Sequence, residues 1–216
     1  MGEREQISAA DFLPEAERLT LRKLRDAASR CKGCELYKSG TQTVFGEGPR
    51  DAKLMLVGEQ PGDQEDRKGR PFVGAAGELL RRTLGEAGVD PARVYITNVV
   101  KHFRYDWEGG RRHSLKPLQT HIHACLPWLE QEVALVKPVA LVCLGAVAAQ
   151  TLIDKKFKIT QQRGEVFETQ WSSWTMATIH PAALLRIPDD DERAAAIERL
   201  RGDLKKAAQH IAERGR

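Results

Sequence analysis

The stretch Lys53-Leu-Met-Leu-Val-Gly58 decides the fold of this chain, and the polar pair Glu59-Gln60 follows it directly. A short apolar run that ends at a glycine is typical of a buried strand in a parallel sheet. Three further strands are predicted from segments of the same kind, at Val94–Asn98, Val139–Gly145 and Trp174–Ile179. The chain therefore contains the strands of one central sheet.

Segments with helical spacing of apolar residues separate and follow these strands. Helices are predicted over Ala75–Gly88, Thr120–Val136, Ala146–Ile153 and Asp190–Arg214. Strands that alternate with helices predict an α/β fold of three layers, α/β/α, around a mainly parallel sheet of four strands. We expect residues 1–216 to form a single domain, in which residues 1–30 are a leader with a helix over Glu15–Arg30.

Composition limits the classes of function. Hydrophobic residues make up 41% and charged residues 30% of the chain, and the formal net charge is +4. A mildly basic protein is compatible with a nucleic-acid partner but does not require one. No apolar run reaches the roughly 20 residues that cross a membrane, and the start Met1–Gln6 is polar, unlike a secretory signal. We therefore expect a cytoplasmic protein that makes no membrane contact and works as a monomer.

Polar residues follow three of the predicted strands at the point where each ends. Glu59 and Gln60 follow the first strand, Asn98 ends the second and His180 follows the last. Ligands of open α/β sheets bind at the carboxyl ends of the strands. These four side chains are therefore predicted to meet in one pocket.

The cysteines predict a metal site. Cys31 and Cys34 form a C-x-x-C pair, and His102 and Cys125 are further candidate ligands. In a cytoplasmic protein such residues are better interpreted as metal ligands or buried thiols than as disulfides. Three cysteines and one histidine suit a zinc ion or an iron–sulfur cluster about equally. Cys143 lies within an apolar strand and is predicted to be an inert core thiol.

The longest irregular stretch is Phe103–Pro117, which contains Gly109-Gly-Arg-Arg-His-Ser114. A loop of this length inside a compact domain is more often functional than idle. Arg111 and Arg112 are the right residues to contact the phosphates of a nucleic-acid backbone.

Several motifs resemble those of the iron–sulfur uracil-DNA glycosylases of family 4 and its relatives. They are Gly58-Glu-Gln-Pro-Gly62, Gly69-Arg-Pro-Phe-Val-Gly74, Thr97-Asn98 and His180-Pro181. The longer string Gly58–Asp66, with Gln60, and Lys101-His102-Phe103 are most similar to the UdgX group. The resemblance implies the uracil-DNA glycosylase fold and uracil-containing DNA, single- or double-stranded, as substrate. It also implies a [4Fe–4S] cluster held by Cys31, Cys34, His102 and Cys125.

The resemblance also implies how the base is held. Phe72 would stack on a uracil that has been flipped out of the helix, as glycosylases require. One amide carries both a donor and an acceptor, so Asn98 would pair with O4 and N3–H of uracil. Gln60 would contact the base as well, and Asp63 would either order the loop near the substrate or cap the helix beyond it.

Two further residues are implied to carry the chemistry. Glu59 would activate the attacking nucleophile or stabilise positive charge on the sugar, and His180 would donate to O2 of the leaving uracil. The segment Ala182–Arg186 is similar to the DNA-intercalating segment of the superfamily, where apolar side chains wedge into the duplex and Arg186 reaches a phosphate.

The loop that precedes Pro117 leaves the outcome of the reaction open. UdgX proteins carry a Lys-Arg-Arg-Ile-His loop whose histidine becomes bonded to the abasic sugar. Counting back from Pro117 without gaps places Ser114 at that position, and a gap of one residue places His113 there. We therefore expect uracil excision with covalent attachment through His113, and retain two alternatives: an ordinary turnover glycosylase and a non-catalytic binder of uracil or abasic DNA. Intact Glu59, Asn98 and His180 argue against the binder.

Overall fold

A computed structural model of the chain describes residues 7–15 and 19–214 and contains a central sheet of five strands. The strands, in the order β2-β1-β5-β7-β6, are Val94–Asn98, Leu54–Gly58, Ala140–Leu144, Thr175–Thr178 and Val166–Phe167. The first four are parallel and match the predicted strands. The predicted number of four was wrong, because β6 adds an antiparallel edge that is only two residues long.

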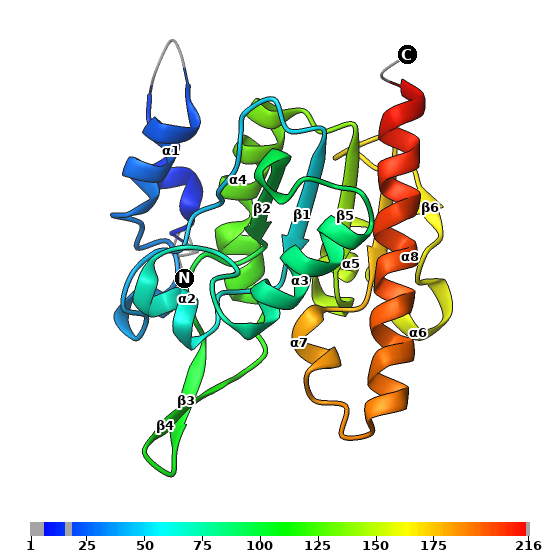
Figure 1. The fold of residues 1–216 in the computed structure, drawn as a ribbon. Helices are drawn as coiled ribbons and strands as arrows, with labels where there is room; N and C mark the ends of the chain where they lie inside the picture. Colours follow the sequence, from blue (N-terminus) through cyan, green and yellow to red (C-terminus); the bar gives the residue numbers. More distant parts are fainter. Residues whose placement is uncertain (1–6, 16–18, 215–216) are drawn as a thin grey trace.

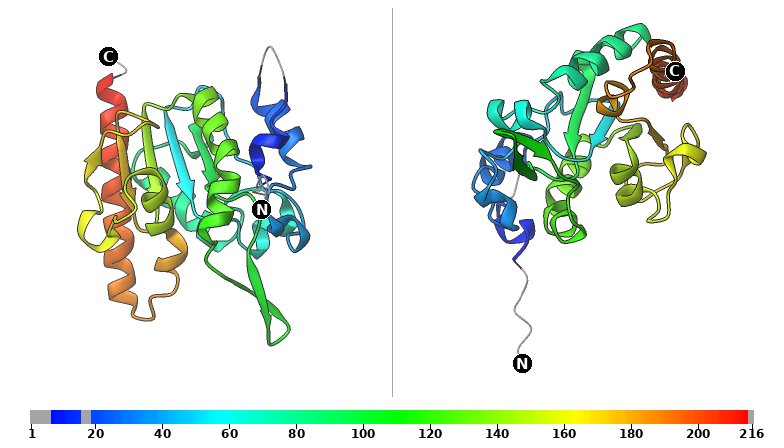
Figure 2. Two further views of the ribbon diagram at one scale, coloured as in Figure 1. Left: turned by 180° about the vertical axis from the view of Figure 1, so that it is seen from behind. Right: turned by 90° about the horizontal axis from the view of Figure 1, so that it is seen from below.

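Helices cover both faces of this sheet, as predicted (Figures 1 and 2). On one face pack α3 (Ala75–Glu86) and α8 (Asp190–Arg214), and on the other α4 (Gln119–Val136) and α5 (Ala146–Leu152). These four helices agree with the predicted ones to within two residues at each end. The short helices α2 (Asp63–Lys68), α6 (Ile159–Gln162) and α7 (Pro181–Leu184) lie in the connections.

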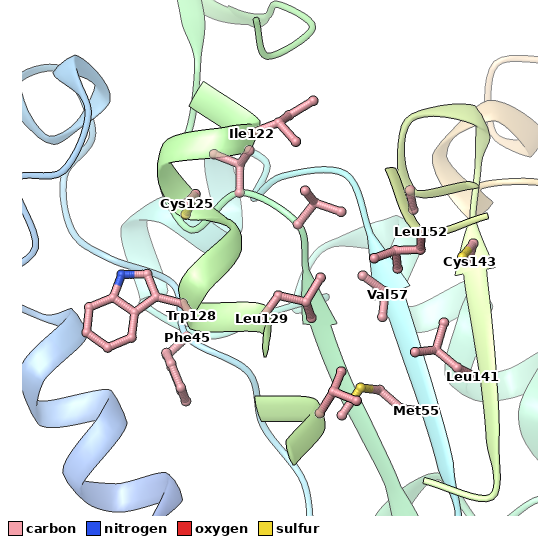
Figure 3. Close-up of a cluster of buried hydrophobic side chains, with 14 of the residues drawn as sticks. Phe45, Met55, Val57, Ile122, Cys125, Trp128, Leu129, Leu141, Cys143 and Leu152 are labelled. Atoms are coloured by element: carbon pink, nitrogen blue, oxygen red, sulfur yellow. The ribbon is translucent and has the colours of Figure 1, made fainter. Parts of the chain in front are cut away.

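Alternation along β1 explains the two layers of core. Leu54 and Leu56 belong to the cluster under α3 and α8, whereas Met55 and Val57 belong to the cluster under α4 and α5. Successive side chains of a strand point to opposite faces, so a continuously apolar strand supplies both cores. Figure 3 shows part of the second cluster, with Met55 and Val57 beside side chains of α4 and α5.

The leader differs from its prediction. Instead of one helix over Glu15–Arg30, the described residues form a 3-10 turn at Ala9–Phe12 and the helix α1 at Leu21–Ala28, while residues 16–18 lie outside the described part. The side chain of Thr20 accepts from the backbone N–H of Lys23 and so fixes the start of α1. Both elements pack against α4.

The predicted irregular loop before Pro117 is a β-hairpin. Its strands are β3 (Tyr105–Glu108) and β4 (Arg111–Ser114). Gly109 and Gly110 form the turn with φ of 57° and 74°, values that favour glycine in a two-residue hairpin loop. Figure 1 shows the hairpin projecting beyond the edge of the sheet at which β1 and β2 end. Among the described helices, none is long and apolar enough to cross a membrane.

Candidate active site

Asn98 and Phe72 meet over the end of β1. Asn98 ends β2 beside Gly58, the last residue of β1, and both Asn98 and Phe72 are buried. A Cβ atom on Gly58 would lie 2.2 Å from Oδ1 of Asn98 and 2.8 Å from Cζ of Phe72. Glycine is therefore required at this position for the two side chains to share the space, which explains why the strand ends in Gly58.

Phe72 continues the site toward His180. The two rings are stacked, with their centroids 5.8 Å apart and an interplanar angle of 29°. The backbone of Phe72 has φ of 53°, a conformation that costs energy for an aromatic residue and that is found preferentially at functional sites. The structure thus brings Asn98, Phe72 and His180 together, as predicted from the strand ends and the motifs.

His180 is held as a neutral hydrogen-bond donor. It caps α7, and its Nδ1 accepts from the backbone N–H of Ala182 at 3.1 Å. Burial lowers the pKa of His180 to about 4, and the positive charge of Arg186 acts in the same direction. At neutral pH the ring therefore carries its proton on Nε2. Gly145 makes room behind it, since a Cβ there would lie 3.0 Å from Cβ of His180.

The carbonyl oxygen of the Asn98 side chain is buried without a hydrogen-bond partner among the described residues. Buried polar atoms are nearly always paired, and an unpaired one calls for an explanation such as an absent ligand. The amide thus offers an acceptor at the point where Phe72 and His180 also converge.

A buried ion pair supports the backbone of Asn98 from below. Nζ of Lys101 lies 2.5 Å from Oε2 of Glu132 and donates to Oγ1 of Thr97 and to the carbonyl oxygen of Asn98, both at 2.7 Å. Tyr95 donates to the same carboxylate, and both charged side chains are at most 1% exposed. Sequence reasoning missed this network. A lysine directly after the apolar pair Val99-Val100 was the available signal.

Glu59 lies half-buried where β1 leads into the next loop. Burial raises the pKa of its carboxyl group, while the positive charges of Lys116 and Arg186 oppose the rise. Glu59 is therefore close enough to feel two cations, one at the base of the hairpin and one just after α7. This placement agrees with a carboxylate at the mouth of the site.

Gln60 is occupied in holding the hairpin. Its Oε1 accepts from the backbone N–H of Arg104 at 3.1 Å, and its Nε2 donates to the carbonyl oxygen of Leu115 at 2.9 Å and to Oγ of Ser114 at 3.0 Å. Both ends of the amide are thus bound to the two strands of the hairpin at its base. The predicted contact of Gln60 with the base is not supported, because its hydrogen-bonding atoms are already engaged.

The two candidates for covalent capture point to opposite faces of the hairpin. Both residues are exposed, but Ser114 reaches Gln60, whereas Nε2 of His113 lies 3.2 Å from the carbonyl oxygen of Glu108 near the tip. Successive residues of a strand alternate in direction, so only one of the two can face the body of the protein. The residue that does so is Ser114.

Arg112 shares the inward face with Ser114. Its Nε lies 2.5 Å from Asp63 and its Nη1 2.7 Å from Asp66, and its side chain is only 6% exposed. Two carboxylates thus neutralise the charge of Arg112, which argues against its predicted phosphate contact. Asp63 begins α2 and pairs with Arg112 and Arg67, and so ties the loop after β1 to the hairpin. Arg111 and Arg186, the other predicted DNA contacts, are exposed.

Three of the four predicted metal ligands gather between the N-terminal arm and α4. Burial raises the pKa of Cys125 to about 12, and Cys34 and Cys31 are close enough to raise it further. Their sulfurs accept N–H groups: Nε1 of Trp128 lies 3.3 Å from Sγ of Cys31, and the backbone nitrogen of Lys101 lies 3.2 Å from Sγ of Cys125. The three cysteines therefore lie close together, with Cys31 and Cys125 buried and Cys34 half-buried.

The fourth predicted ligand, His102, follows Lys101. Its Nε2 lies 3.0 Å from Oγ1 of Thr43, which leaves Nδ1 for another partner. In the described part of the chain, no three His, Cys, Asp or Glu side chains are close enough to hold a single metal ion. Cys143 is fully buried in β5, and burial raises its pKa, in agreement with an inert core thiol.

Two surface hollows, of about 470 and 590 Å³, lie away from this site. The first opens at the amino end of β2, near Val94 and Arg70, and the second lies between α4 and α5. Neither includes Glu59, Asn98 or His180. The candidate site is therefore identified from its residues, which are Glu59, Asn98 and the stacked pair Phe72 and His180 at the strand ends.

Comparison with known proteins agrees with this site. The family model of the uracil DNA glycosylase superfamily matches residues 45–205. The type-4 uracil-DNA glycosylase of Pyrobaculum aerophilum is 36% identical over 79% of this chain and 87% of its own length. That of Thermotoga maritima is 35% identical over 88% and 94%, and that of Archaeoglobus fulgidus 38% over 73% and 79%.

The chain belongs to the uracil-DNA glycosylase superfamily. Its similarity to proteins named type-4 uracil-DNA glycosylases agrees with the motifs that begin at Gly58 and His180. The closer resemblance to the UdgX group stays a prediction. The residues matched by the family model begin after Cys31 and Cys34, so the metal site depends on separate evidence.

Proposed function

We propose that this protein is a turnover uracil-DNA glycosylase, which hydrolyses the N-glycosidic bond of uracil in DNA and releases the abasic product. The observation that carries the proposal is the unpaired, buried Oδ1 of Asn98 beside the stacked pair Phe72 and His180. The names of the relatives, type-4 uracil-DNA glycosylases, support the same substrate and reaction.

Recognition of the base follows from this geometry. A uracil flipped out of the DNA stacks on Phe72, and Asn98 reads its edge. Oδ1 of Asn98 accepts from N3–H, and the amide nitrogen donates to O4. Cytosine presents an acceptor at N3 and a donor at C4, so it would face unfavourable pairs at both positions. The Lys101–Glu132 pair keeps the backbone of Asn98 in place while this contact forms.

Bond cleavage uses the two other strand ends. As the bond between C1′ and N1 breaks, its electron pair leaves with uracil, and Nε2–H of neutral His180 donates to the developing charge on O2. Ionised Glu59 stabilises the positive charge on the sugar and accepts a proton from a water whose oxygen bonds to C1′. That proton is then available to the departing uracil anion or to solvent.

Hydrolysis is favoured over covalent capture by the direction of the hairpin side chains. His113, the predicted nucleophile, faces away from Gln60 and contacts the tip of the hairpin. Ser114 faces inward, but its partner there is the amide of Gln60, which cannot act as a base. Water is therefore the nucleophile in the proposed reaction.

The cofactor proposal is a [4Fe–4S] cluster held by Cys31, Cys34, His102 and Cys125. Thiolates such as those of buried Cys31 and Cys125 and half-buried Cys34 are the usual ligands of such a cluster, and the family resemblance favours iron–sulfur over zinc. When bound it would join the N-terminal arm to α4 and take no part in bond cleavage. Purified protein is expected to contain iron and absorb visible light. Zinc without iron in elemental analysis would exclude the cluster.

The reaction is tested with uracil-containing single-stranded and double-stranded DNA in separate incubations, each followed by a denaturing gel. Free abasic DNA in molar excess over the enzyme is the expected result. A protein–DNA band that survives denaturation would establish capture, and unchanged DNA in both incubations would establish a non-catalytic binder. Monomeric state and cytoplasmic location stay proposals, and sedimentation of the purified protein tests the first of them.

A further inference from the structure

We propose that Trp107 on β3 is a stacking platform for an unpaired base of the DNA strand, a few nucleotides from the flipped uracil. This inference rests on the proposed function, because it assumes that uracil-containing DNA occupies the site. It assigns the hairpin a contact with a base in addition to the phosphate contact expected of Arg111.

Trp107 is exposed to an extent that packing does not explain. It is 61% exposed, the highest value among the large hydrophobic side chains that the structure describes as exposed. Soluble proteins usually bury most of a tryptophan, and exposed aromatic residues are typical of surfaces that bind a partner. The exposed indole offers a flat apolar surface on which a planar ligand can stack.

The Trp107 indole is held in place by a row of contacts between rings and a guanidinium group. The rings of Phe103 and Tyr105 are 5.2 Å apart, and the guanidinium of Arg112 lies 5.4 and 4.9 Å from their centroids. Tyr105 in turn packs against Trp107, with centroids 6.1 Å apart and an angle of 84°. Since Arg112 is fixed by Asp63 and Asp66, little side-chain freedom is lost when a base stacks on the indole.

The distance of Trp107 from the clamp at Gln60, the residue after Glu59, suits a neighbouring base. Gln60 clamps the hairpin at Arg104, and Trp107 lies three residues farther along the strand. At about 3.3 Å per residue this is about 10 Å, or about three nucleotides of a stacked strand with 3.4 Å between bases. The hairpin projects beyond the end of the sheet at which β1 and β2 end, which is the end that carries Glu59 and Asn98 (Figure 1).

Charge favours DNA as the occupant. Apart from Arg112, which Asp63 and Asp66 neutralise, residues 104–116 carry three basic side chains, Arg104, Arg111 and Lys116, against two acidic ones, Asp106 and Glu108. Arg111 near the tip and Lys116 at the base of the hairpin are exposed and available to the phosphates of a bound strand. Basic residues combined with an aromatic platform are the usual means of binding single-stranded nucleic acid.

The test is a scan with abasic spacers. Single-stranded oligonucleotides carry a central 2′-fluoro-2′-deoxyuridine, which resists cleavage, and an abasic spacer at one neighbouring position in turn. With the natural protein, we expect one spacer position to weaken binding by about 5- to 150-fold, the range that base–aromatic stacking gives. Trp107→Ala should weaken binding to the unmodified strand by the same factor and be insensitive to that spacer. Trp107→Phe should restore most of the affinity.

The matched control is Val166→Ala, which changes an exposed apolar residue on β6. This edge strand lies at the far side of the sheet from β2, so the variant should bind DNA like the natural protein. Equal binding by Trp107→Ala and the natural protein would overturn the proposal, and so would a spacer effect that persists in Trp107→Ala. These results differ from failure of the proposed function, in which the natural protein releases no uracil from any DNA.

Discussion

The carboxyl end of the sheet and the hairpin hold their charged groups in different ways. At the carboxyl end of the sheet, Lys101 and Glu132 form an ion pair that is almost fully buried and is tied to the backbone of Asn98. In the hairpin, Arg112, whose side chain is 6% exposed, bridges Asp63 and the buried Asp66, and Gln60 clamps the strands with hydrogen bonds. The backbone of Asn98 is therefore fixed by the core, whereas the hairpin is fixed by side chains of the loop after β1 and of α2.

The largest effect is expected from breaking the buried pair of Lys101 and Glu132. Glu132→Ala would leave the ammonium of Lys101 buried and unpaired, so the free energy of unfolding should fall by about 3–5 kcal/mol. Urea denaturation followed by circular dichroism measures the change. Arg201→Ala, which removes a surface pair with Glu198 on α8, should leave the denaturation midpoint where it was. A Glu132→Ala protein as stable as the natural one would show that the pair does not support the site.

Removal of the proposed donor to the leaving group comes next. His180→Ala should lower the single-turnover rate of uracil release by about 10²–10³-fold, the typical effect of losing one donor to a developing anion. The folded state should persist, because the losses are one capping bond at Ala182 and the ring contact with Phe72. A loss of less than tenfold in the measured rate would contradict the role of His180.

A smaller effect is expected from loosening the hairpin. Gln60→Ala removes the clamp at Arg104, Ser114 and Leu115, and each such hydrogen bond contributes about 0.5–1.5 kcal/mol. We expect KM for DNA to rise by about tenfold while kcat changes little. Steady-state kinetics with uracil-containing single strands separates the two constants. A fall in kcat alone would instead indicate that Gln60 acts on the base.

The smallest effect concerns pH. Burial raises the pKa of Glu59 above that of an ordinary glutamate, and activity requires the ionised form. Activity should therefore fall with decreasing pH at a higher pH than an ordinary carboxylate would give, while His180, with a pKa of about 4, remains neutral. Because Lys116 opposes the rise, Lys116→Ala should move this acid limb to higher pH. A shift to lower pH in the kcat profile would contradict the placement of Glu59.

Much of the fold could be predicted because it depends on local patterns. Apolar runs that end at Gly58 and Gly145 define parallel strands, and helical spacing defines the four main helices. The strand β6 is too short to leave a pattern, since two residues show no alternation. The hairpin was missed even though Gly109-Gly110 lies between two segments that pair as strands.

The candidate site could likewise be predicted only in part. Asn98 and His180 could be predicted to meet because parallel strands end at one edge of the sheet, and the motifs added Phe72. The hydrogen-bond partners of Gln60 and Arg112 could not be predicted, since they lie 44 to 55 and 46 to 71 positions away in the chain, respectively. Polar side chains of this kind take the partner that the folded chain supplies.

The central claim is that residues at the strand ends carry out the reaction and that the hairpin supplies no nucleophile. Its most direct test counts abasic products per enzyme molecule in excess uracil-containing single-stranded DNA. Three proteins are compared: the natural chain, His113→Ala and Asn98→Asp. The account predicts many products per molecule for the first two, with no band that survives denaturation. Asn98→Asp should be slower by about 5- to 150-fold, from the loss of about 1–3 kcal/mol of edge contact. The account is contradicted if the natural chain yields at most one product per molecule together with a covalent band that His113→Ala removes.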